Sequence, residues 1–392
     1  MTLRRDHSEP LWVASAGTVA MEWGRIGCLG FGGPPTHIIM LRDLCVDRRK
    51  WLTSTDFEDA VVACNLLPGP ASTQLAIYCA LRVRGRLGAL VGGLAFILPG
   101  LILVLALASL FLQHSPPRWI AGAGAGAGAA VAAVAVQAGI GLIPPSWRRS
   151  KATSPVRWVL YASLGAVAAA TIGPYLVLAL IACGATEVAI QARSRHNHLS
   201  GLLAGSAGGV AVATGGLFAV AWTAFKVGAL AYGGGFVIIP LMRSDAVDVY
   251  HWMTGTQFLN AVALGQVTPG PVTQTVAAVG YAAAGIGGGL LAAAVAFAPS
   301  FAFILFGGDR FDRLRANATA QRFLLGAGPA AIGAILGSAV PLAATIKQTW
   351  QVAVLLGAGI LLLVLRRGVV VTLIAAAAVG VVVAAAGGPL PR

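Results

Sequence analysis

Residues 65–74 read NLLPGPASTQ and residues 266–275 read QVTPGPVTQT, each inside a strongly apolar region. Proline removes a backbone donor and blocks the carbonyl one turn back, while glycine adds flexibility, so Pro-Gly-Pro interrupts a helix. The two interruptions begin at Pro68 and Pro269, which are 201 positions apart. The sequence therefore predicts two apolar segments that are broken at corresponding points.

The composition is typical of a membrane protein. The chain of 392 residues is 57% hydrophobic and only 10% charged, with a mean hydropathy of +0.82, whereas soluble globular proteins carry about 25% charged residues. A helix needs about 20 apolar residues to cross a bilayer. We therefore predict an all-α polytopic protein in the lipid bilayer, with apolar runs at 87–112, 119–143, 156–190, 201–225, 286–306, 323–346, 352–365 and 369–387.

Other classes of protein are disfavoured. The net charge of +14 comes from basic residues in short loops, which membrane orientation explains, and no nucleic-acid-binding motif is present. The five cysteines lack CxxC spacing and His196-x-His198 is a weak metal motif, so we expect no metal and no other cofactor. The N-terminal MTLRRDHSEPLW is a poor cleavable signal and is expected in the mature protein.

Glycine-rich stretches and catalytic motifs do not indicate an enzyme. The run AGAGAGAGAA at 121–130 predicts close helix packing, because no strand precedes it as a nucleotide-binding loop would require. We expect the same packing role for Gly85, Gly88 and Gly92-Gly93. No serine triad, HExxH motif or suitably placed carboxylate pair is present, so we expect no enzymatic activity.

The chain contains an internal repeat. Residues 27–76 align without a gap on residues 228–277, with GCLGFGG on GALAYGG, WLTSTDFEDAV on WMTGTQFLNAV and PGP on PGP. Duplications of this kind are typical of transporters. We therefore predict an N-terminal transporter repeat over residues 1–198 and a C-terminal repeat over residues 199–392.

Basic residues indicate that the two repeats have inverted topologies. The loop at 42–50 carries four basic residues, whereas its counterpart at 243–251 keeps only Arg243. Cytoplasmic loops are the ones rich in lysine and arginine. Corresponding loops are therefore expected on opposite sides of the membrane.

The same charges bear on the two breaks. Both flanks of 57–82 are basic and both flanks of 258–282 are not, so we predict that each broken segment is a re-entrant helical hairpin that turns at PGP. A single kinked helix that crosses the membrane is the alternative. The re-entrant arrangement gives each repeat about five crossings, which in the first repeat are 11–35, 87–112, 119–143, 157–172 and 174–190. This odd number inverts the second repeat, and only Arg4 and Arg5 oppose it.

The breaks are also the candidate substrate site, because interrupted segments in inverted repeats mark the binding site of transporters. A new half-helix begins after each break, and its N–H groups, hydroxyls and positive dipole end suit an oxyanion. The predicted site comprises Pro68, Gly69, Pro70, Ser72, Thr73 and Gln74 from the first repeat, with Pro269, Gly270, Pro271, Thr273 and Gln274 from the second.

Arg25 and Lys226 are aligned cations in the first apolar segment of each repeat. A charge in such a segment is unfavourable, which favours a substrate-binding role, but long side chains that reach the membrane interface explain them equally well. Glu22 has no acidic counterpart. We expect it either to pair with Arg25 or to carry a proton.

Further candidates occur at corresponding positions of both repeats. Gly32-Gly33 and Gly233-Gly234 permit either ligand contact or tight helix packing, and we include them in the predicted binding site. Two sets of residues persist although their loops are predicted on opposite sides, and we expect them to act as structural clamps or gates: Arg42, Asp47 and Trp51, with Arg243, Asp248 and Trp252.

Longer stretches resemble a known family. FGGPPTHIIMLRDLCVDRRKWL, NLLPGPASTQLAIYCALRVRG and FILPG are similar to the N-terminal signature of the chromate ion transporter family, and YGGGFVIIPLM, QVTPGPVTQTVAAVGY and FAPSF to its C-terminal signature. The resemblance implies a long-chain, two-domain protein of the inner membrane that exports chromate, with sulfate as the related tetrahedral dianion. Ala71-Ser72-Thr73 departs from the acidic or glutamine-rich residues that the family usually has there.

We therefore expect a secondary transporter that exports chromate from a bacterial cytoplasm by alternating access and confers chromate resistance. A sulfate or other oxyanion permease on the same fold, or an anion channel, is the alternative. A homodimer is compatible with this assignment, and no nucleic-acid partner is expected.

Overall fold

The computed structural model describes residues 14–67, 69–113, 115–151, 154–171, 175–193, 216–231, 238–307 and 317–391. Within these ranges all regular secondary structure is helical. Several predictions concern residues outside them, namely those for Pro68, Gly233-Gly234, the junction between the predicted crossings 157–172 and 174–190, Arg4-Arg5 and His196-x-His198.

The helices follow the apolar runs of the sequence. The first half contains α1 (Ala16–Leu29), α2 (Pro34–Arg42), the π-helix η1 (Asp43–Arg48), α3 (Ser54–Leu66), α4 (Ala71–Phe111), α5 (Arg118–Lys151), α6 (Pro155–Thr171) and α7 (Leu176–Arg193). The second half contains α8 (Leu217–Leu230), α9 (Ile238–Arg243), the π-helix η3 (Ser244–Val249), α10 (Gly255–Val267), the 3₁₀-helix η4 (Val272–Gln274), α11 (Thr275–Gly307), α13 (Ala318–Ala344), α14 (Thr349–Gly359), the π-helix η6 (Ile360–Val364) and α15 (Val369–Ala385).

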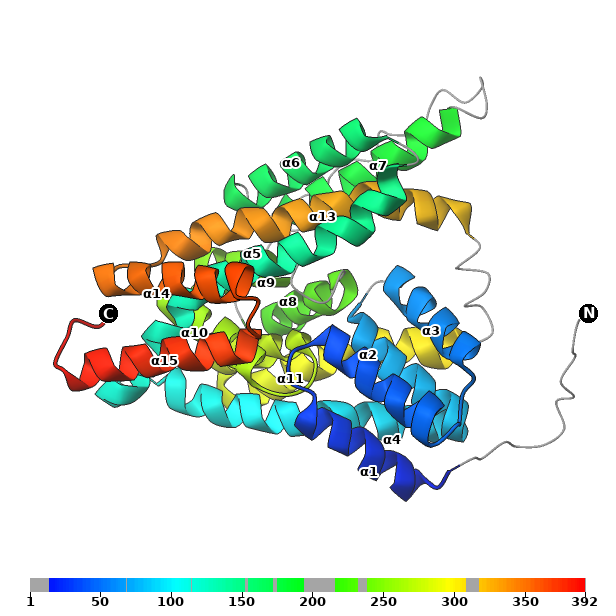
Figure 1. Cartoon of the computed structure of the whole chain (residues 1–392), viewed down its shortest axis with the longest axis horizontal. Helices are drawn as coiled ribbons and strands as arrows, with labels where there is room; N and C mark the ends of the chain where they lie inside the picture. The colour runs from blue at the N-terminus through cyan, green and yellow to red at the C-terminus, as the bar shows by residue number, and fades with distance from the viewer. Residues whose placement is uncertain are drawn as a thin grey trace, which may run out of the picture.

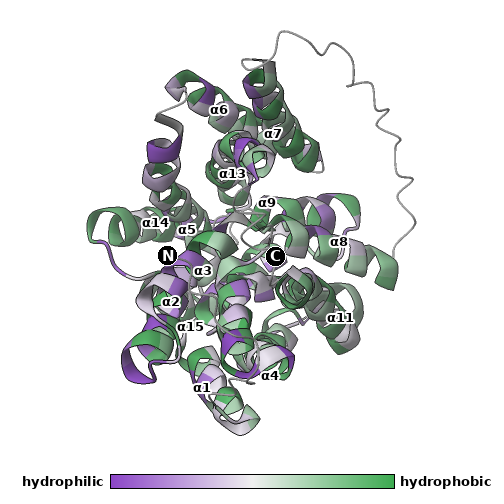
Figure 2. Ribbon diagram, turned by 90° about the vertical axis from the view of Figure 1, so that its right-hand side faces the viewer, coloured by the Kyte–Doolittle hydropathy of each residue, from purple (hydrophilic) through white to green (hydrophobic). Residues whose placement is uncertain are grey.

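The outer surface of this helix assembly is apolar. Four helical stretches are long and apolar enough to cross a membrane, and they cover 71–111, 118–149, 272–307 and 318–344. Large hydrophobic side chains point outward from them, including Ile102 on α4 and Phe306 on α11. Hydrophobic residues dominate the ribbon of α11, whereas hydrophilic ones gather near α2 and α3 (Figure 2). The predicted all-α class is confirmed within the described residues, and the apolar helices fit a polytopic membrane protein.

The helix that follows each break is bent sharply. In α4 the backbone leaves helical geometry at Arg84 and Gly85, and in α11 it does so at Ala284 and Gly285. An unbent helix with the 41 residues of α4 would be about 60 Å long, roughly twice the thickness of the bilayer core. Each of the two helices therefore consists of a short segment directly after the break and a longer segment after the bend.

Gly85 forms one of these bends, so its backbone conformation accounts for a glycine that we had assigned to helix packing. Gly85 and Gly285 adopt φ angles of +64° and +62°, in the left-handed region that favours glycine. A Cβ built on Gly285 would meet nothing within 4 Å. Backbone conformation and not packing accounts for that glycine.

Backbone features recur in the two halves at a spacing that changes at the breaks. The turn residues Lys50 and His251, with φ of 52° and 53°, are 201 positions apart, but Gly85 and Gly285, like Pro99 and Pro299, are 200 apart. The gapless alignment over 27–76 is therefore wrong after the breaks. The second half has one residue fewer there, since a 3₁₀ turn replaces the first α-helical turn, and Gln74 corresponds to Gln274.

The first predicted crossing, 11–35, also required correction. The helix α1 ends at Leu29, and the chain turns at Gly32 and Gly33, whose φ angles are +100° and +76°. The next helix, α2, then begins at Pro34. Positive φ at two successive residues accounts for the glycine pair, so the helix of this segment ends at Leu29 rather than at residue 35.

The two halves are interlocked. The helices α6 and α7 of the first half pack on α13 of the second, and α14 and α15 of the second half pack on α5 of the first (Figure 1). Between these groups α4 contacts α11. The glycine run of α5 lies against α15, where a Cβ on Gly126 would clash with the carbonyl of Ala376. This confirms the small-residue packing predicted for residues 121–130.

Candidate functional site

The two Pro-Gly-Pro triplets, here called break one (68–70) and break two (269–271), have the same backbone design in their described residues. Each incoming helix ends at an extended residue, Leu67 with φ −77° and ψ 146° and Thr268 with φ −79° and ψ 145°. The central glycine then takes a positive φ, +121° at Gly69 and +93° at Gly270. An extended Pro70 or Pro271 caps the next helix. Only glycine takes such φ angles readily, which explains the triplet.

Each break lies against helices of the opposite half. A Cβ built on Gly69 would lie 3.3 Å from the Ser300 hydroxyl oxygen on α11 and 3.4 Å from the carbonyl oxygen of Gly228 on α8. A Cβ built on Gly100 of α4 would clash with the carbonyl oxygen of Pro269 at break two. Break one is thus held in the interior against α8 and α11, and break two against α4.

Break one carries hydroxyl groups that the described protein leaves without partners. Ser72, Thr73 and Gln74 follow it in the first turn of α4, and all three are buried. The hydroxyls of Thr73 and Ser300 have no hydrogen-bond partner among the described residues. Buried hydroxyls are normally paired, so this end of α4 retains donors for another group.

Break two is tied to the surrounding protein. The Gly270 N–H donates to the Gly30 carbonyl at 3.1 Å. The Gln274 Nε2 donates to the Ile97 carbonyl at 2.7 Å, and the Thr275 hydroxyl donates to the Val272 carbonyl at 2.8 Å. Gln274 Oε1 has no partner among the described residues, but as a hydrogen-bond acceptor it cannot donate to an anion. Thr273 is buried beside it.

His37 of α2 connects the two breaks. Its Nε2 lies 2.9 Å from the Gly30 carbonyl, which also accepts from Gly270 of break two. Its Nδ1 lies 3.4 Å from the Ser72 hydroxyl beside break one. The ring is fully buried and makes an edge contact with Phe96. One side chain therefore joins elements at both predicted half-sites.

Glu22 does not pair with Arg25, contrary to one of the two roles expected for it. Its Oε1 accepts from Arg49 at 2.6 Å, because the π-helical η1 brings the end of the basic loop back to α1. Arg25 is exposed and lines a separate hollow of about 310 Å³ that it shares with Glu22 and Asp43. Arg48 lines the hollow as well, so its two carboxylates face two guanidinium groups and the hollow has no excess of positive charge for a dianion.

Lys226 forms the corresponding link in the second half with the charges reversed. Its Nζ lies 2.5 Å from Asp245 Oδ2, and the Thr223 hydroxyl donates to the same oxygen at 2.8 Å. The aligned cations Arg25 and Lys226 thus have different environments. A direct role of either in substrate binding stays a prediction.

The predicted clamp residues also differ between the halves. Arg42 bridges α2 to the start of α3, donating to Ser54 at 2.9 Å and to Glu58 at 3.2 Å. Arg243 instead donates to Asp248 within its own turn at 2.9 Å. Asp47 is exposed, Trp51 stacks on Trp23, and Trp252 stacks on Tyr250.

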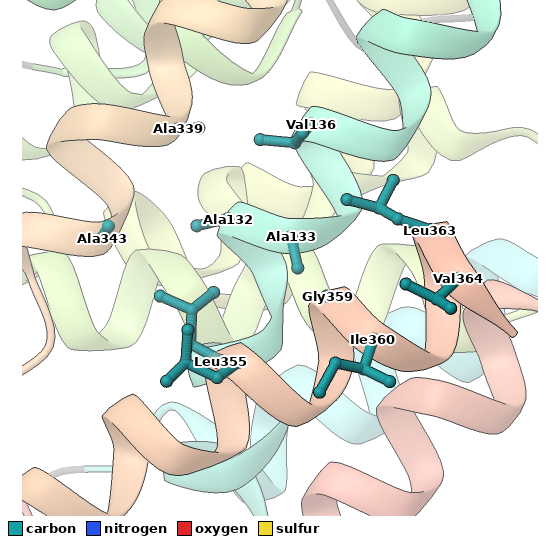
Figure 3. Close-up of a pocket in the computed structure, with 11 residues that line it drawn as sticks. Ala132, Ala133, Val136, Ala339, Ala343, Leu355, Gly359, Ile360, Leu363 and Val364 are labelled. Carbon is teal, nitrogen blue, oxygen red and sulfur yellow. The ribbon is translucent and has the colours of Figure 1, made fainter.

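A hollow of about 410 Å³ elsewhere in the molecule offers no chemistry for an anion. It lies between α5, α13 and the continuous helix α14–η6, and its lining side chains are aliphatic (Figure 3). Leu355, Ile360 and Leu363 contribute much of this surface (Figure 3). The breaks remain the better candidate site.

Sequence reasoning missed Ser300, Gly100 and His37. Ser300 and Gly100 follow Pro299 and Pro99 in the quoted FAPSF and FILPG stretches, so an alignment of those prolines would have paired them. His37 lies within FGGPPTHIIM, but its counterpart in the second half is Ile238, and the repeat gave no signal for it.

Comparisons with known proteins agree on one family. The family described as "Chromate transporter" matches residues 17–188 and, a second time, residues 218–381. A "Chromate transport protein" of Cupriavidus metallidurans is 31% identical over 83% of this chain and 82% of its own length. A protein of the same description from Pseudomonas aeruginosa is 31% identical over 81% of this chain and 79% of its own.

A "Probable chromate transport protein" of Synechococcus elongatus is 30% identical over 81% of this chain and 82% of its own length. No solved structure matches the chain. The two family matches cover most of the residues and include both breaks. The chain therefore belongs to the chromate transporter family, as its signature stretches predicted, and is a multi-pass membrane protein of a transporter family.

Proposed function

We propose that this protein is a secondary transporter that exports chromate from the bacterial cytoplasm and thereby confers chromate resistance. The observation that carries the proposal is the convergence of both breaks on helices of the opposite half, with Gly69 beside Ser300 and Pro269 beside Gly100. A site built by both halves is suited to alternating access, because relative movement of the halves opens it to one side at a time.

The proposed architecture consists of two inverted repeats, residues 1–198 and 199–392, in the bacterial inner membrane. Each repeat has about five crossings and one re-entrant hairpin, formed by α3 with the first segment of α4 or by α10 with the first segment of α11. The short segments and the bends at Gly85 and Gly285 support this topology. Non-helical backbone is tolerated at membrane depth when protein buries it, as at both breaks.

The membrane potential supplies the driving force in this mechanism. The cytoplasm is negative, so outward movement of a dianion is favoured by about 2.3 kcal/mol per charge per 100 mV. Export therefore needs little additional coupling. Sulfate has the same shape and charge, which makes an oxyanion permease on this fold the competing assignment that the experiment must separate.

Everted membrane vesicles from a host without its own exporter test the proposal. Uptake of radiolabelled chromate would be measured with and without excess sulfate, for wild type, Pro68→Ala/Pro70→Ala and Pro269→Ala/Pro271→Ala. A matched control is Pro144→Ala/Pro145→Ala, since this proline pair lies within α5 and away from the breaks. We expect saturable uptake by wild type and the control, and its loss in both break variants.

Two outcomes would contradict the proposal. Vesicles that ignore chromate but transport sulfate would exclude chromate export and favour the permease. Uptake that does not saturate with chromate concentration would instead indicate an anion channel.

A further inference from the structure

We propose that break one binds the oxyanion, that the Thr73 and Ser300 hydroxyls donate to it, and that break two serves as a fixed anchor. This inference rests on the proposed function. It adds which of the two breaks contacts the ion and which donors recognise it.

The first line of support is the state of the two hydroxyls. Thr73 and Ser300 are fully buried, and neither hydroxyl oxygen has a hydrogen-bond partner among the described residues. Ser338, another buried serine in a long apolar helix, shows the usual solution by donating to the Ile335 carbonyl one turn back at 2.6 Å. Thr73 and Ser300 do not use this intrahelical bond, so their donors stay available to a ligand.

The second line of support is that both hydroxyls lie at break one. Thr73 is in the first turn of α4, directly after Pro70. Ser300 approaches from α11 of the opposite half, and its hydroxyl oxygen faces Gly69. Both residues thus lie near the N-terminal end of α4, where the helix dipole is positive. Neutral donors of this kind suit a tetrahedral dianion such as chromate or sulfate, whose oxygens are all acceptors.

The counterpart position at break two excludes the same arrangement. Gly100 stands where Ser300 stands in the other half, and a Cβ there would clash with Pro269 O and Gln274 Oε1. No hydroxyl side chain fits in that place. Gln274 Oε1 has no partner among the described residues, but it is an acceptor and offers an anion no hydrogen bond. The bonds from Gly270 to Gly30 and from Gln274 to Ile97 hold this break in place.

The test uses the full-length protein, in vesicles for transport and in detergent for Tm. The variants are Ser300→Ala, Thr73→Val and Thr73→Ser, with Ser338→Ala as the matched control. We expect Ser300→Ala and Thr73→Val to raise the KM for both chromate and sulfate about tenfold or more, as for loss of a hydrogen bond to a charged group. Thr73→Ser keeps the hydroxyl and should keep a KM near that of wild type.

Stability distinguishes binding from packing. Removal of an unpaired buried hydroxyl should leave the Tm without anion unchanged or higher. The rise in Tm that chromate or sulfate causes should shrink in Ser300→Ala and Thr73→Val, because it reports binding. Ser338→Ala should retain the full rise.

The experiment distinguishes failure of the proposed transport function from failure of the proposed anion site at break one. A wild type that transports neither oxyanion would overturn the proposed function. A wild type that transports, together with an unchanged KM in both Ser300→Ala and Thr73→Val, would overturn this inference alone. A lowered Tm with an unchanged KM would assign the hydroxyls to packing and would overturn it as well.

Discussion

Break one and break two have similar backbone conformations in their described residues, but the side chains around them differ. Both have an extended residue, a glycine with positive φ and an extended proline. At break one the Thr73 and Ser300 hydroxyls are buried without partners among the described residues, whereas at break two the side-chain donors of Gln274 and Thr275 are bonded to protein carbonyls.

This difference indicates how the two repeats of a duplicated chain can take different roles. In the proposed mechanism, duplication supplies two equivalent helix ends that can face an anion. A single replacement, serine at 300 against glycine at 100, then makes one end a donor site and lets the other close against protein. The two proposed half-sites therefore need not be chemically equivalent, even where their backbone conformations are similar.

The largest effect is expected from Gly100→Ala, which tests whether break two is closed by direct backbone contact. The added Cβ would clash with Pro269 O, and overpacking of this kind destabilises by about 1–3 kcal/mol. We expect a clearly lower Tm in detergent. Gly141→Ala is the control, since nothing lies within 4 Å of its Cβ position. Equal Tm values for the two variants would contradict the packing described for break two.

Gln274→Leu should have the next largest effect. It removes the 2.7 Å bond to the buried Ile97 carbonyl and leaves that carbonyl short of a donor, at a cost of about 1–2 kcal/mol. Thr73→Val should cause no such loss, because the Thr73 hydroxyl makes no bond to the described protein. The Tm values of the two variants are compared with that of wild type. A larger drop for Thr73→Val than for Gln274→Leu would contradict the description of break two as the bonded break.

His37→Phe tests the link between the breaks. Phenylalanine keeps a ring against Phe96 but loses the contacts with Gly30 and Ser72. The Gly30 carbonyl still accepts from Gly270, so the loss of stability should be about 1 kcal/mol. We expect the chromate transport rate to fall far more than the Tm does. A rate near that of wild type would show that the breaks work without this link.

The smallest effect is expected from Glu58→Gln at the exposed end of α3. The hydrogen bonds from Ser54 and then Arg42 lower the pKa of the Glu58 carboxyl, so its small contribution to stability is present at neutral pH and is lost as the pH falls through that pKa. The Tm of the variant should lie slightly below that of wild type at pH 7 and match it near pH 3. A difference that grows with acid would refute this sign.

Much of the fold could be predicted from the sequence because the signals are local. Pro-Gly-Pro interrupts a helix through its own backbone chemistry, and the apolar runs predict the helices that follow α5. The bend at Gly85 was missed because a glycine in a helix is equally typical of packing. The register of the repeat after the breaks was missed because the interval from Pro271 to Gln274 is one residue shorter than the interval from Pro70 to Gln74.

The chemistry of the site depends on contacts between distant positions, which a single sequence does not reveal. Ser300 meets Gly69 only because α8 and α11 fold against break one. Glu22 pairs with Arg49 because η1 returns the loop to α1. Both partners are ordinary in the sequence, and only the packing of the helices distinguishes them.

The position of bound chromate tests directly whether break one binds the ion. A crystal structure of the full-length protein with chromate, with anomalous diffraction data collected at the chromium absorption edge, would place the ion independently of the protein density. The account predicts one chromium peak beside the Thr73 and Ser300 hydroxyls, within the reach of a chromate oxygen. A peak beside Gln274 and Gly270, or in the hollow lined by Arg25, would contradict it.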